Sequence, residues 1–199
     1  MAHQLTIQSF SGAALAPHLD ALGGLRIAVF REFPYLYEGK LEYERDYLKV
    51  YLNCPRSMVA LAFDGDRAVG ATTCMPLEEE GAEFKAPFVN AGLDISEFCY
   101  FGESILLPEY RGFGVGKEFM RRREAHSRSL SGVKYCTFCV VDRPADHPLR
   151  PANYVPLDAF WTKQGFVKRP DMQTSFSWQE IGEPEESPKR MIYWVKTLE

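Results

Sequence analysis

The chain has 199 residues, of which 46% are hydrophobic and 25% are charged, and its formal net charge is −4. These values are typical of a soluble globular protein, and the length suits a single domain, which we expect to span residues 1–199. The acidic balance argues against a general nucleic-acid binder. No run of about 18 or more apolar residues indicates a membrane span, so we expect neither a nucleic acid nor a membrane as partner.

The cysteines and the N-terminus bear on the compartment. The five cysteines, Cys54, Cys74, Cys99, Cys136 and Cys139, are odd in number and lie in apolar segments. This predicts buried, reduced thiols rather than a disulfide framework. Cys136 and Cys139 stand three positions apart on an expected strand and so face opposite sides, and the histidines lack a metal-binding spacing. The first residues lack a secretion signal. We expect a cytoplasmic protein without a metal site.

In the first half of the chain, the pattern alternates between helices and strands. Residues 5–10 alternate apolar and polar side chains, as a strand does. Two apolar runs flank Asp64-Gly65, which is a strong hairpin signal. Ser11 suits the N-cap of a helix that is interrupted near Gly23-Gly24. We expect strands at 5–10, 57–63 and 67–75 and helices at about 12–30 and 40–52, followed by an irregular excursion over 76–98.

The second half predicts a central sheet with two further helices. Residues 133–141 are almost continuously apolar, which is typical of a central, parallel-type strand. Gly165 suits the position just after a helix end. We expect strands at 98–107, 133–141, 174–180 and 191–197, helices at about 114–130 and 154–164, and a long loop over 143–152.

One stretch, from Glu103 to Met120, organises the rest. It predicts a short strand, a turn led by Pro108 and a glycine-rich corner that opens a basic helix. Glycines lack Cβ atoms, so backbone N–H groups at such a corner can approach a ligand closely. The first turn of a helix also offers unpaired N–H groups and the positive end of the helix dipole. The stretch therefore predicts a cradle for an anion, most often a phosphate.

Glycine spacing separates three kinds of phosphate site. A dinucleotide fingerprint needs G-x-G-x-x-G after the first strand of a βαβ unit, whereas here Gly112-x-Gly114-x-Gly116 follows a hairpin in mid-chain. A Walker A loop needs four residues between its glycines and a hydroxyl after the lysine, but here the run is one residue short and Glu118 follows Lys117. Both motifs are excluded, and with them an NTP-dependent transferase is disfavoured.

The third possibility fits. Arg111-Gly-Phe-Gly-Val-Gly116 matches [RQ]-x-x-G-x-[GA], the acyl-CoA pyrophosphate loop of the GNAT superfamily of N-acetyltransferases, and Leu107-Pro-Glu-Tyr-Arg-Gly resembles the exit from that family's fourth strand. Phe160-Trp161-Thr-Lys-Gln-Gly165-Phe166 is similar to the end of the family's fourth helix. The element order agrees over nearly the whole chain. The segment from Arg111 to Arg128 carries six basic and two acidic residues, which suits a pyrophosphate.

The resemblance implies an α/β (α+β) domain of the GNAT fold. Its single mixed, mostly antiparallel sheet would have about seven strands and about four flanking helices, with the fourth and fifth strands parallel and splayed. It also implies acetyl-CoA as cosubstrate. The residues expected to bind it are Ile105, Leu106, Leu107, Arg111, Gly112, Phe113, Gly114, Val115, Gly116, Lys117, Asn153 and Trp161. Backbone groups of Ile105 and Leu107 would hydrogen-bond the pantetheine arm and polarise the thioester carbonyl.

The proton-transfer residues are less well marked. Glu103 shares a strand face with Ile105 and Leu107 and is the candidate base, directly or through water, against the alternative of a structural glutamate. The family's usual acid is a tyrosine at the position of Trp161, and tryptophan cannot supply that proton. The role then passes to Tyr154 or to solvent.

The resemblance places the acceptor near two loops. Phe33, Tyr35 and Tyr37 would cover the acceptor site, and Asp142 and His147 would border it, with a hydrophobic plug and a plain surface loop as the alternatives. Aromatic side chains with carboxylates suit an ammonium group. We expect an N-acetyltransferase that moves an acetyl group to a small-molecule or peptide amine; the alternative is a CoA-binding sensor without turnover. Trp178 and Trp194 either pack in the core or form the seam of a homodimer.

Overall fold

All strands of the protein join one sheet. The structure, a computed structural model, describes residues 5–198. Its seven strands lie in the order β1-β2-β3-β4-β5-β7-β6. Only β4 and β5 pair in parallel, and the other neighbours are antiparallel. The strands are β1 Leu5–Phe10, β2 Met58–Asp64, β3 Arg67–Pro76, β4 Phe98–Leu106, β5 Tyr135–Val141, β6 Val167–Trp178 and β7 Ser187–Thr197. The predicted fold class, a mixed and mostly antiparallel sheet with flanking helices, is confirmed.

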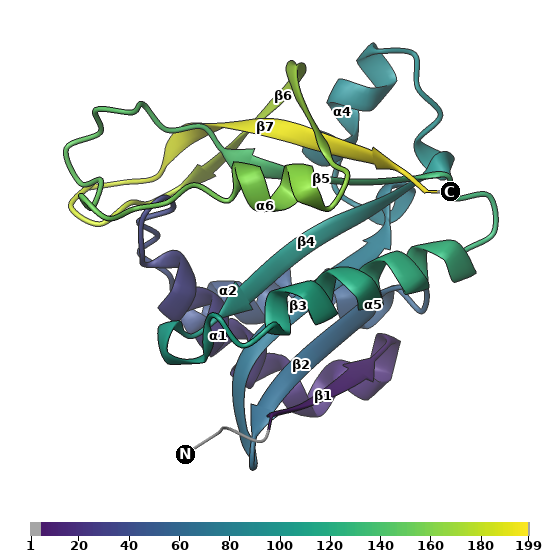
Figure 1. The fold of residues 1–199 in the computed structure, drawn as a ribbon, viewed down its shortest axis with the longest axis horizontal. Coiled ribbons are helices and arrows are strands. Elements are labelled where there is room, and N and C mark those ends of the chain that lie inside the picture. Colours follow the sequence, from purple (N-terminus) through teal and green to yellow (C-terminus); the bar gives the residue numbers. More distant parts are fainter. Residues whose placement is uncertain (1–4, 199) are drawn as a thin grey trace.

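Helices cover both faces of this sheet (Figure 1). On one face, Leu22 of α1 packs with Ile105 of β4, and Phe88 of α4 packs with Tyr100. On the other face, Met120 of α5 packs with Phe101. The α-helices are α1 Leu19–Phe30, α2 Leu41–Tyr47, α3 Lys49–Asn53, α4 Ala82–Asn90, α5 Val115–Ser129 and α6 Asp158–Lys163. Short 3₁₀ helices are η1 Gly12–His18, η2 Leu77–Glu79, η3 Ile95–Glu97 and η4 Pro108–Tyr110.

The first helix differs from its prediction. Its α-helical part begins only at Leu19, after the 3₁₀ helix η1, and it continues through Gly23-Gly24 without interruption. The reason for Gly23 is packing: a Cβ atom there would lie 3.1 Å from the Cβ of Glu44 on α2. The glycine therefore lets two helices approach closely.

Three further expectations from the sequence are wrong. The excursion over residues 76–98 contains a full helix, α4, whose Phe84 and Phe88 pack in the core. The last helix begins at Asp158, so Tyr154 lies in the loop before it; Pro156 lacks an N–H and disfavours helix at the residue before it. Arg123, one of the six basic residues counted as suiting a pyrophosphate, is instead buried against the ring of Phe101 at 4.4 Å.

One segment, Gly12–Phe30, is long and apolar enough to cross a membrane by length and composition. In the structure it is η1 followed by α1, and its Leu15, Leu22 and Leu25 pack in the core. It also carries Asp20 and Arg26. A core helix of a globular domain passes the same test, so this one segment is weak evidence. The expectation of no membrane partner stays a prediction.

Candidate active site

The centre of the site is the place where β4 and β5 part. Their parallel pairing covers only Phe98–Tyr100 against Tyr135–Thr137, and the strands diverge beyond it. At the same point the register between β3 and β4 shifts, between Thr72 and Cys74, which marks a β-bulge. Gly102 lies in this bulge. A side chain is excluded at this position because any Cβ there would overlap the hydroxyl of Tyr51. The bulge leaves Phe101 on the α5 face and turns Glu103 and Ile105 toward α1.

Glu103 is buried in a network of hydrogen bonds. Its side chain is 2% exposed. Oε1 accepts from the guanidinium of Arg26 and, at 3.2 Å, from the hydroxyl of Tyr47. Oε2 accepts from the hydroxyl of Thr73 at 2.5 Å, and that hydroxyl lies 3.0 Å from the hydroxyl of Tyr51. Both carboxylate oxygens are therefore engaged by side chains from α1, α2 and β3.

Arg26 joins two buried carboxylates across the helices. Besides Glu103 it pairs with Glu44 of α2, and its guanidinium lies 4.2 Å from the centre of the Tyr47 ring. Burial lowers the pKa of Arg26, but Glu103, Tyr47 and Glu44 outweigh burial and raise that pKa above its usual value. The arginine therefore holds the site's negative charges in place as a permanent cation.

A third buried carboxylate, Glu80, was not predicted from the sequence. It follows η2 directly, is 5% exposed, and its Oε1 has no hydrogen-bond partner among the described residues. Burial and repulsion from Glu103 raise the pKa of Glu80 to about 8. In sequence it is only the last of three glutamates, Glu78-Glu-Glu80, in a segment that predicts irregular structure. Nothing in that run distinguishes the buried member from the two that pair with Arg56.

The free edge of β4 differs from the prediction for the pantetheine arm. The N–H of Leu107 donates to the carbonyl of Val69 on β3 at 3.0 Å, and its carbonyl accepts from Tyr110 at 3.0 Å. By the alternation of an antiparallel ladder, Ile105 also directs its backbone groups to β3. The N–H of Leu107 is therefore not available to a ligand. The groups that face the gap are those of Ser104 and Leu106, and the Leu106 carbonyl accepts from Nε of Arg111 at 3.0 Å.

The glycine corner continues from this edge into α5. Gly112 and Gly114 have φ of +88° and +84°, values that favour glycine strongly. A Cβ built on Gly112, Gly114 or Gly116 would meet no atom of the described residues within 4 Å, so packing does not require these glycines. The space beside them, at a helix N-terminus, fits the pyrophosphate predicted there. Phe113 is 65% exposed and Lys117 is exposed, and Arg111 pairs with Glu32 at 2.9 Å.

The basic helix is partly neutralised within itself. Glu118 in the first turn of α5 pairs with Arg121 and Arg122, whose hydrogen bonds lower its pKa to about 2. Arg111 is paired with Glu32, so the exposed cation near the corner without an ion pair among the described residues is Lys117. The exposed positive charge near the corner is therefore smaller than the sequence count suggests.

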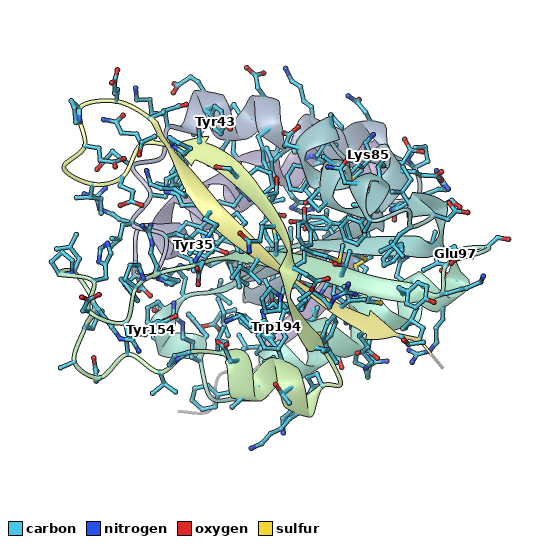
Figure 2. The ribbon with its side chains drawn as sticks, turned by 90° about the horizontal axis from the view of Figure 1, so that it is seen from above. Tyr35, Tyr43, Lys85, Glu97, Tyr154 and Trp194 are labelled. Atoms are coloured by element: carbon cyan, nitrogen blue, oxygen red, sulfur yellow. The ribbon has the colours of Figure 1, made fainter. Side chains whose placement is uncertain are left out.

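Several residues predicted at the acceptor site are brought together. The ring of Phe33 lies 4.7 Å from that of Tyr154 and 5.6 Å from that of His147. Tyr35 packs beside Phe30 and Trp178, and burial raises the pKa of Tyr35 above its usual value. Figure 2 shows Tyr35 and Tyr154 toward one end of the molecule, with Glu97 toward the other.

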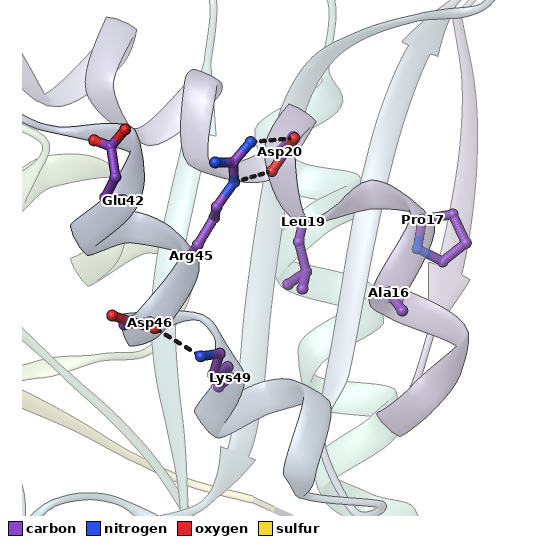
Figure 3. A pocket seen from close by; sticks show the side chains of 8 residues that line it. All are labelled: Ala16, Pro17, Leu19, Asp20, Glu42, Arg45, Asp46 and Lys49. Carbon is purple, nitrogen blue, oxygen red and sulfur yellow. Dashed lines mark hydrogen bonds and ion pairs between the residues drawn. The ribbon is translucent and has the colours of Figure 1, made fainter.

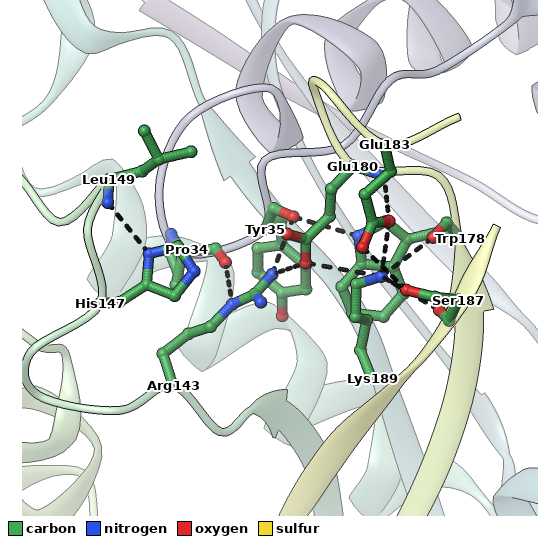
Figure 4. Close-up of polar contacts among 10 residues, drawn as sticks. All are labelled: Pro34, Tyr35, Arg143, His147, Leu149, Trp178, Glu180, Glu183, Ser187 and Lys189. Carbon is green, nitrogen blue, oxygen red and sulfur yellow. Dashed lines mark hydrogen bonds and ion pairs between the residues drawn. The ribbon is translucent and has the colours of Figure 1, made fainter. Parts of the chain in front are cut away.

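Arg143 holds the loop that carries Pro34 and Tyr35 in place. Its guanidinium donates to the carbonyls of Pro34 and Tyr35 and pairs with Glu180, which in turn lies near Lys189 (Figure 4). These partners come from two separate segments, the loop after α1 and the region where β6 connects to β7, so one buried cation ties the two together. Tyr37 forms a bridge with Glu180 and burial raises its pKa. Asp142 is bound to Arg190 of β7.

The remaining predicted residues pack among hydrophobic side chains or lie at the surface. Trp161 is half-buried, with its ring 5.2 Å from that of Phe138 and 5.3 Å from that of Trp194. Asn153 is exposed. Trp194 is buried in the core, and Trp178 donates to the carbonyl of Tyr35. The homodimer stays a prediction.

The cysteines lie as the sequence predicts. All five cysteines are free and buried, and Cys136 and Cys139 pack in different clusters on opposite faces. Within residues 5–198 no group of three or more His, Cys, Asp or Glu side chains could hold a metal ion.

An open hollow lies outside the site. This hollow, of about 550 Å³, lies between η1, α1 and α2, beside the ion pairs Arg45–Asp20 and Lys49–Asp46 (Figure 3). No lining residue comes from β4 or the glycine corner.

Solved structures share this fold over almost the whole chain. An acetyltransferase from Thermus thermophilus is 20% identical with a TM-score of 0.56, and the match covers 99% of this chain and 100% of that one. An acetyltransferase from Streptococcus agalactiae is 13% identical with a TM-score of 0.61 and the same coverage. Arabidopsis thaliana NAA60 in complex with a bisubstrate analogue is 13% identical with a TM-score of 0.59, covering 98% of this chain and 100% of that one.

Sequence comparison gives the family. Among curated proteins no sequence matches this chain. The model of the acetyltransferase (GNAT) family matches residues 26–152, which is more than half of the chain and runs from Arg26 of the buried network through the glycine corner to the loop before α6. The identities of the solved structures are low, so they show the fold alone. With the family model matched across the site and the fold shared end to end, the chain belongs to the GNAT family of acetyltransferases.

Proposed function

We propose that this protein transfers an acetyl group from acetyl-CoA to the amine of a small-molecule or peptide acceptor by direct attack on the thioester. The observation that carries the proposal is the course of one strand. β4 leaves its parallel partner at Tyr100, turns a buried carboxylate to one face at Glu103 and ends in the glycine corner of α5. An acyl donor held by the corner would reach the gap beside that carboxylate.

On the donor side, the backbone does most of the binding. The N–H groups at the start of α5 and the open space beside Gly112, Gly114 and Gly116 suit a pyrophosphate. The side chains of Arg111 and Lys117 add positive charge. We assign the pantetheine arm to the backbone groups of Ser104 and Leu106, since those of Ile105 and Leu107 are directed to β3. When bound, acetyl-CoA would supply an activated acyl group and a thiolate leaving group.

On the acceptor side, the site is aromatic and acidic. Phe33, Tyr154 and His147 form one rim, and Glu103 accepts a hydrogen bond from the hydroxyl of Tyr47. Aromatic faces and carboxylates both attract an ammonium group. Because side chains bind both oxygens of Glu103, this carboxylate suits a fixed negative charge rather than a proton acceptor in contact with the amine.

Protonation of the departing thiolate is assigned to Tyr154. Tyr154 lies in the loop that follows β5, at the end where β5 is no longer paired with β4, and burial raises the pKa of Tyr154, which keeps the phenol protonated. Trp161 cannot fill this role because its indole is a poor acid and its ring packs against Phe138 and Trp194.

The same packing of Trp161 favours a second candidate function, a CoA-binding sensor without turnover. One assay separates the two. The protein is incubated with acetyl-CoA and a panel of amines while free thiol is measured, and acetyl-CoA binding is measured separately by calorimetry. Thiol release that depends on an amine supports the transferase. Binding without release across the panel favours the sensor, and absence of binding contradicts both.

A further inference from the structure

Glu80 is a buried carboxylate for which the fold provides no cationic partner in contact among the described residues. It follows η2, which continues from the end of β3, where Met75 pairs with Tyr100, the last residue of β4 that pairs with β5. The preceding Leu77 is fully buried in the cluster that contains Tyr100. Glu80 itself is 5% exposed, and its Oε1 makes no hydrogen bond within residues 5–198.

A buried carboxylate oxygen without a partner is costly, and proteins usually keep one for a ligand or a reaction. The ionisable groups that interact electrostatically with Glu80 are Glu103 and Tyr100 from β4, Tyr47 and Tyr51 from α2 and α3, Cys139 and Tyr193 from β5 and β7, and Glu83 and Lys85 from α4. Among these only Lys85 is a cation, and its ammonium donates to the carbonyl of Glu78 instead. The surroundings of Glu80 are therefore aromatic and acidic.

The two carboxylates of this region therefore differ in kind. Glu103 has both oxygens bound by Arg26, Tyr47 and Thr73, so it is a fixed charge. Glu80 has an oxygen without a partner and lies close enough for Glu103 to repel its charge. A positively charged group placed between them would relieve that repulsion and give Oε1 of Glu80 its missing hydrogen bond.

We infer that Glu80 and Glu103 together form the ammonium-binding floor of the acceptor site, and that Glu80 is the group that takes the proton from the bound amine. This assignment rests on the proposed function. It specifies the acceptor as a primary amine that binds as its cation, with no second negative charge next to the nitrogen, because a carboxylate there would meet Glu80 and Glu103.

The proton balance of this step is simple. The ammonium nitrogen gives one proton to Glu80, and the freed lone pair forms the C–N bond at the acyl carbon. The C–S bond breaks, and the leaving thiolate takes a proton from Tyr154. The second proton that the nitrogen loses on becoming an amide returns through solvent to the Tyr154 oxygen, so one proton in all is left on Glu80. A primary amine such as that of lysine has a pKa of about 10.4, and an ordinary glutamate one of about 4.3. With the pKa of Glu80 raised to about 8 by burial and by Glu103, the gap between donor and acceptor shrinks to about 2. Matched pKa values are what a general base needs.

A binding experiment tests the floor without turnover. The protein saturated with CoA is titrated by calorimetry at pH 7 with benzylamine and 1,4-diaminobutane, and with benzyl alcohol and 1,4-butanediol as their neutral counterparts. We expect each amine to bind at least about 10-fold more tightly than its alcohol. Because Glu80 is mostly protonated in the free protein at this pH, binding of the cation should release close to one proton, which appears as a dependence of the heat on the buffer.

Two variants test whether Glu80 causes the preference for the amine and the proton release. Glu80→Gln should reduce the preference for the amine to less than about twofold and abolish the proton release. Glu79→Gln is the matched control, since it removes the same charge from the adjacent residue, whose side chain is 45% exposed and pairs with Arg56. It should behave as the wild type. Equal binding of amine and alcohol by the wild type, absence of amine binding at millimolar concentration, or an unchanged preference in Glu80→Gln would each overturn the inference.

Kinetics separate this inference from the proposed function. For any amine that supports thiol release, log kcat/KM of the wild type should rise with pH to a midpoint near 8 and fall near the pKa of the amine. In Glu80→Gln the rising limb should move to the pKa of the amine, and kcat should fall about 100-fold or more while acetyl-CoA affinity stays within about twofold. Thiol release with an unchanged pH profile overturns the role of Glu80 alone. A preserved amine preference without any thiol release contradicts the transferase and leaves the floor supported.

Discussion

The glycine corner and the buried carboxylate network are built in opposite ways. The corner, residues 111–118, is contiguous in sequence, largely exposed, and set by backbone conformation at two positive φ values. The network joins Arg26 of α1, Glu44 of α2 and Glu103 of β4 and is largely buried, and the carboxylate of Glu80, which follows η2, is buried as well. Under the proposed function, a local backbone shape would bind the donor, whereas the choice of acceptor would depend on residues that only the fold brings together.

The largest effect is expected at the network. In Glu103→Gln, Arg26 would keep only Glu44 as an anionic partner, so the free energy of unfolding should fall by about 3 kcal/mol. Loss of the fixed charge should lower kcat/KM for the amine by about 100- to 1000-fold, with acetyl-CoA affinity nearly unchanged. Urea unfolding, the thiol assay and calorimetry measure the three quantities.

The control for this variant is Glu109→Gln. Glu109 is 51% exposed and lies 3.7 Å from Arg67, so its loss should change stability by less than about 0.5 kcal/mol and leave both substrates unaffected. If Glu103→Gln weakened acetyl-CoA binding as much as amine turnover, the assignment of acetyl-CoA to the corner and of the acceptor amine to the network would be wrong.

The next effect concerns the pH dependence of stability. The pKa of Glu80 is raised to about 8 in the folded protein, so between pH 4.5 and 8 the folded state binds a proton that the unfolded state has lost. Rising pH therefore destabilises the folded state across this window, by at most about 1.4 kcal/mol per pH unit, and the loss levels off above it. Glu80→Gln has no such proton.

This difference can be measured by urea unfolding of the wild type and Glu80→Gln at several pH values. The variant should gain stability relative to the wild type from about pH 5 to pH 8 and hold that gain above pH 8. A difference that is flat across this range would show that Glu80 ionises as an exposed glutamate does.

At the glycine corner we expect a smaller effect, and it concerns the affinity for acetyl-CoA rather than turnover of the amine. Gly114→Ala places a Cβ at φ +84° and into the space proposed for the pyrophosphate, so acetyl-CoA affinity should fall about 10- to 100-fold. Gly132→Ala is matched, because Gly132 has φ +82° and lies beyond the other end of α5. Both variants should lose about 1 kcal/mol of stability, but only the first should lose affinity for acetyl-CoA.

The same contrast explains what the sequence could predict. The hairpin at Asp64-Gly65, the corner and the end of the helix at Gly165 depend on neighbours in sequence, and each lies where it was predicted. The rings of Phe33, Tyr154 and His147 also lie close together, and their assignment to the acceptor site and to proton transfer stays a prediction.

Long-range packing accounts for the failures. Gly23 looks like a helix break but is a helix contact, because Glu44 of α2 passes over it. Glu80 cannot be told from Glu78 and Glu79 until the fold buries it and leaves the others on the surface. The bulge at Gly102 changes which backbone groups of β4 reach the gap, and a strand with strict alternation gives no sign of it. Each case needs a contact between residues far apart in the chain.

The smallest effect is expected at Trp161, where the family resemblance and the packing disagree. Trp161→Tyr and Trp161→Phe differ by one hydroxyl, the group that the family's tyrosine would use as an acid. Because the ring at this position packs against Phe138 and Trp194, both variants should lose about 1 kcal/mol of stability, and their kcat/KM values should agree within about twofold. If Trp161→Tyr were instead about 10-fold faster than Trp161→Phe, the hydroxyl would reach the thiolate and the acid role would belong to α6 rather than to Tyr154. The expected equality would leave proton delivery with the loop that Arg143 ties to the acceptor rim, so that both proton transfers depend on contacts made by the fold.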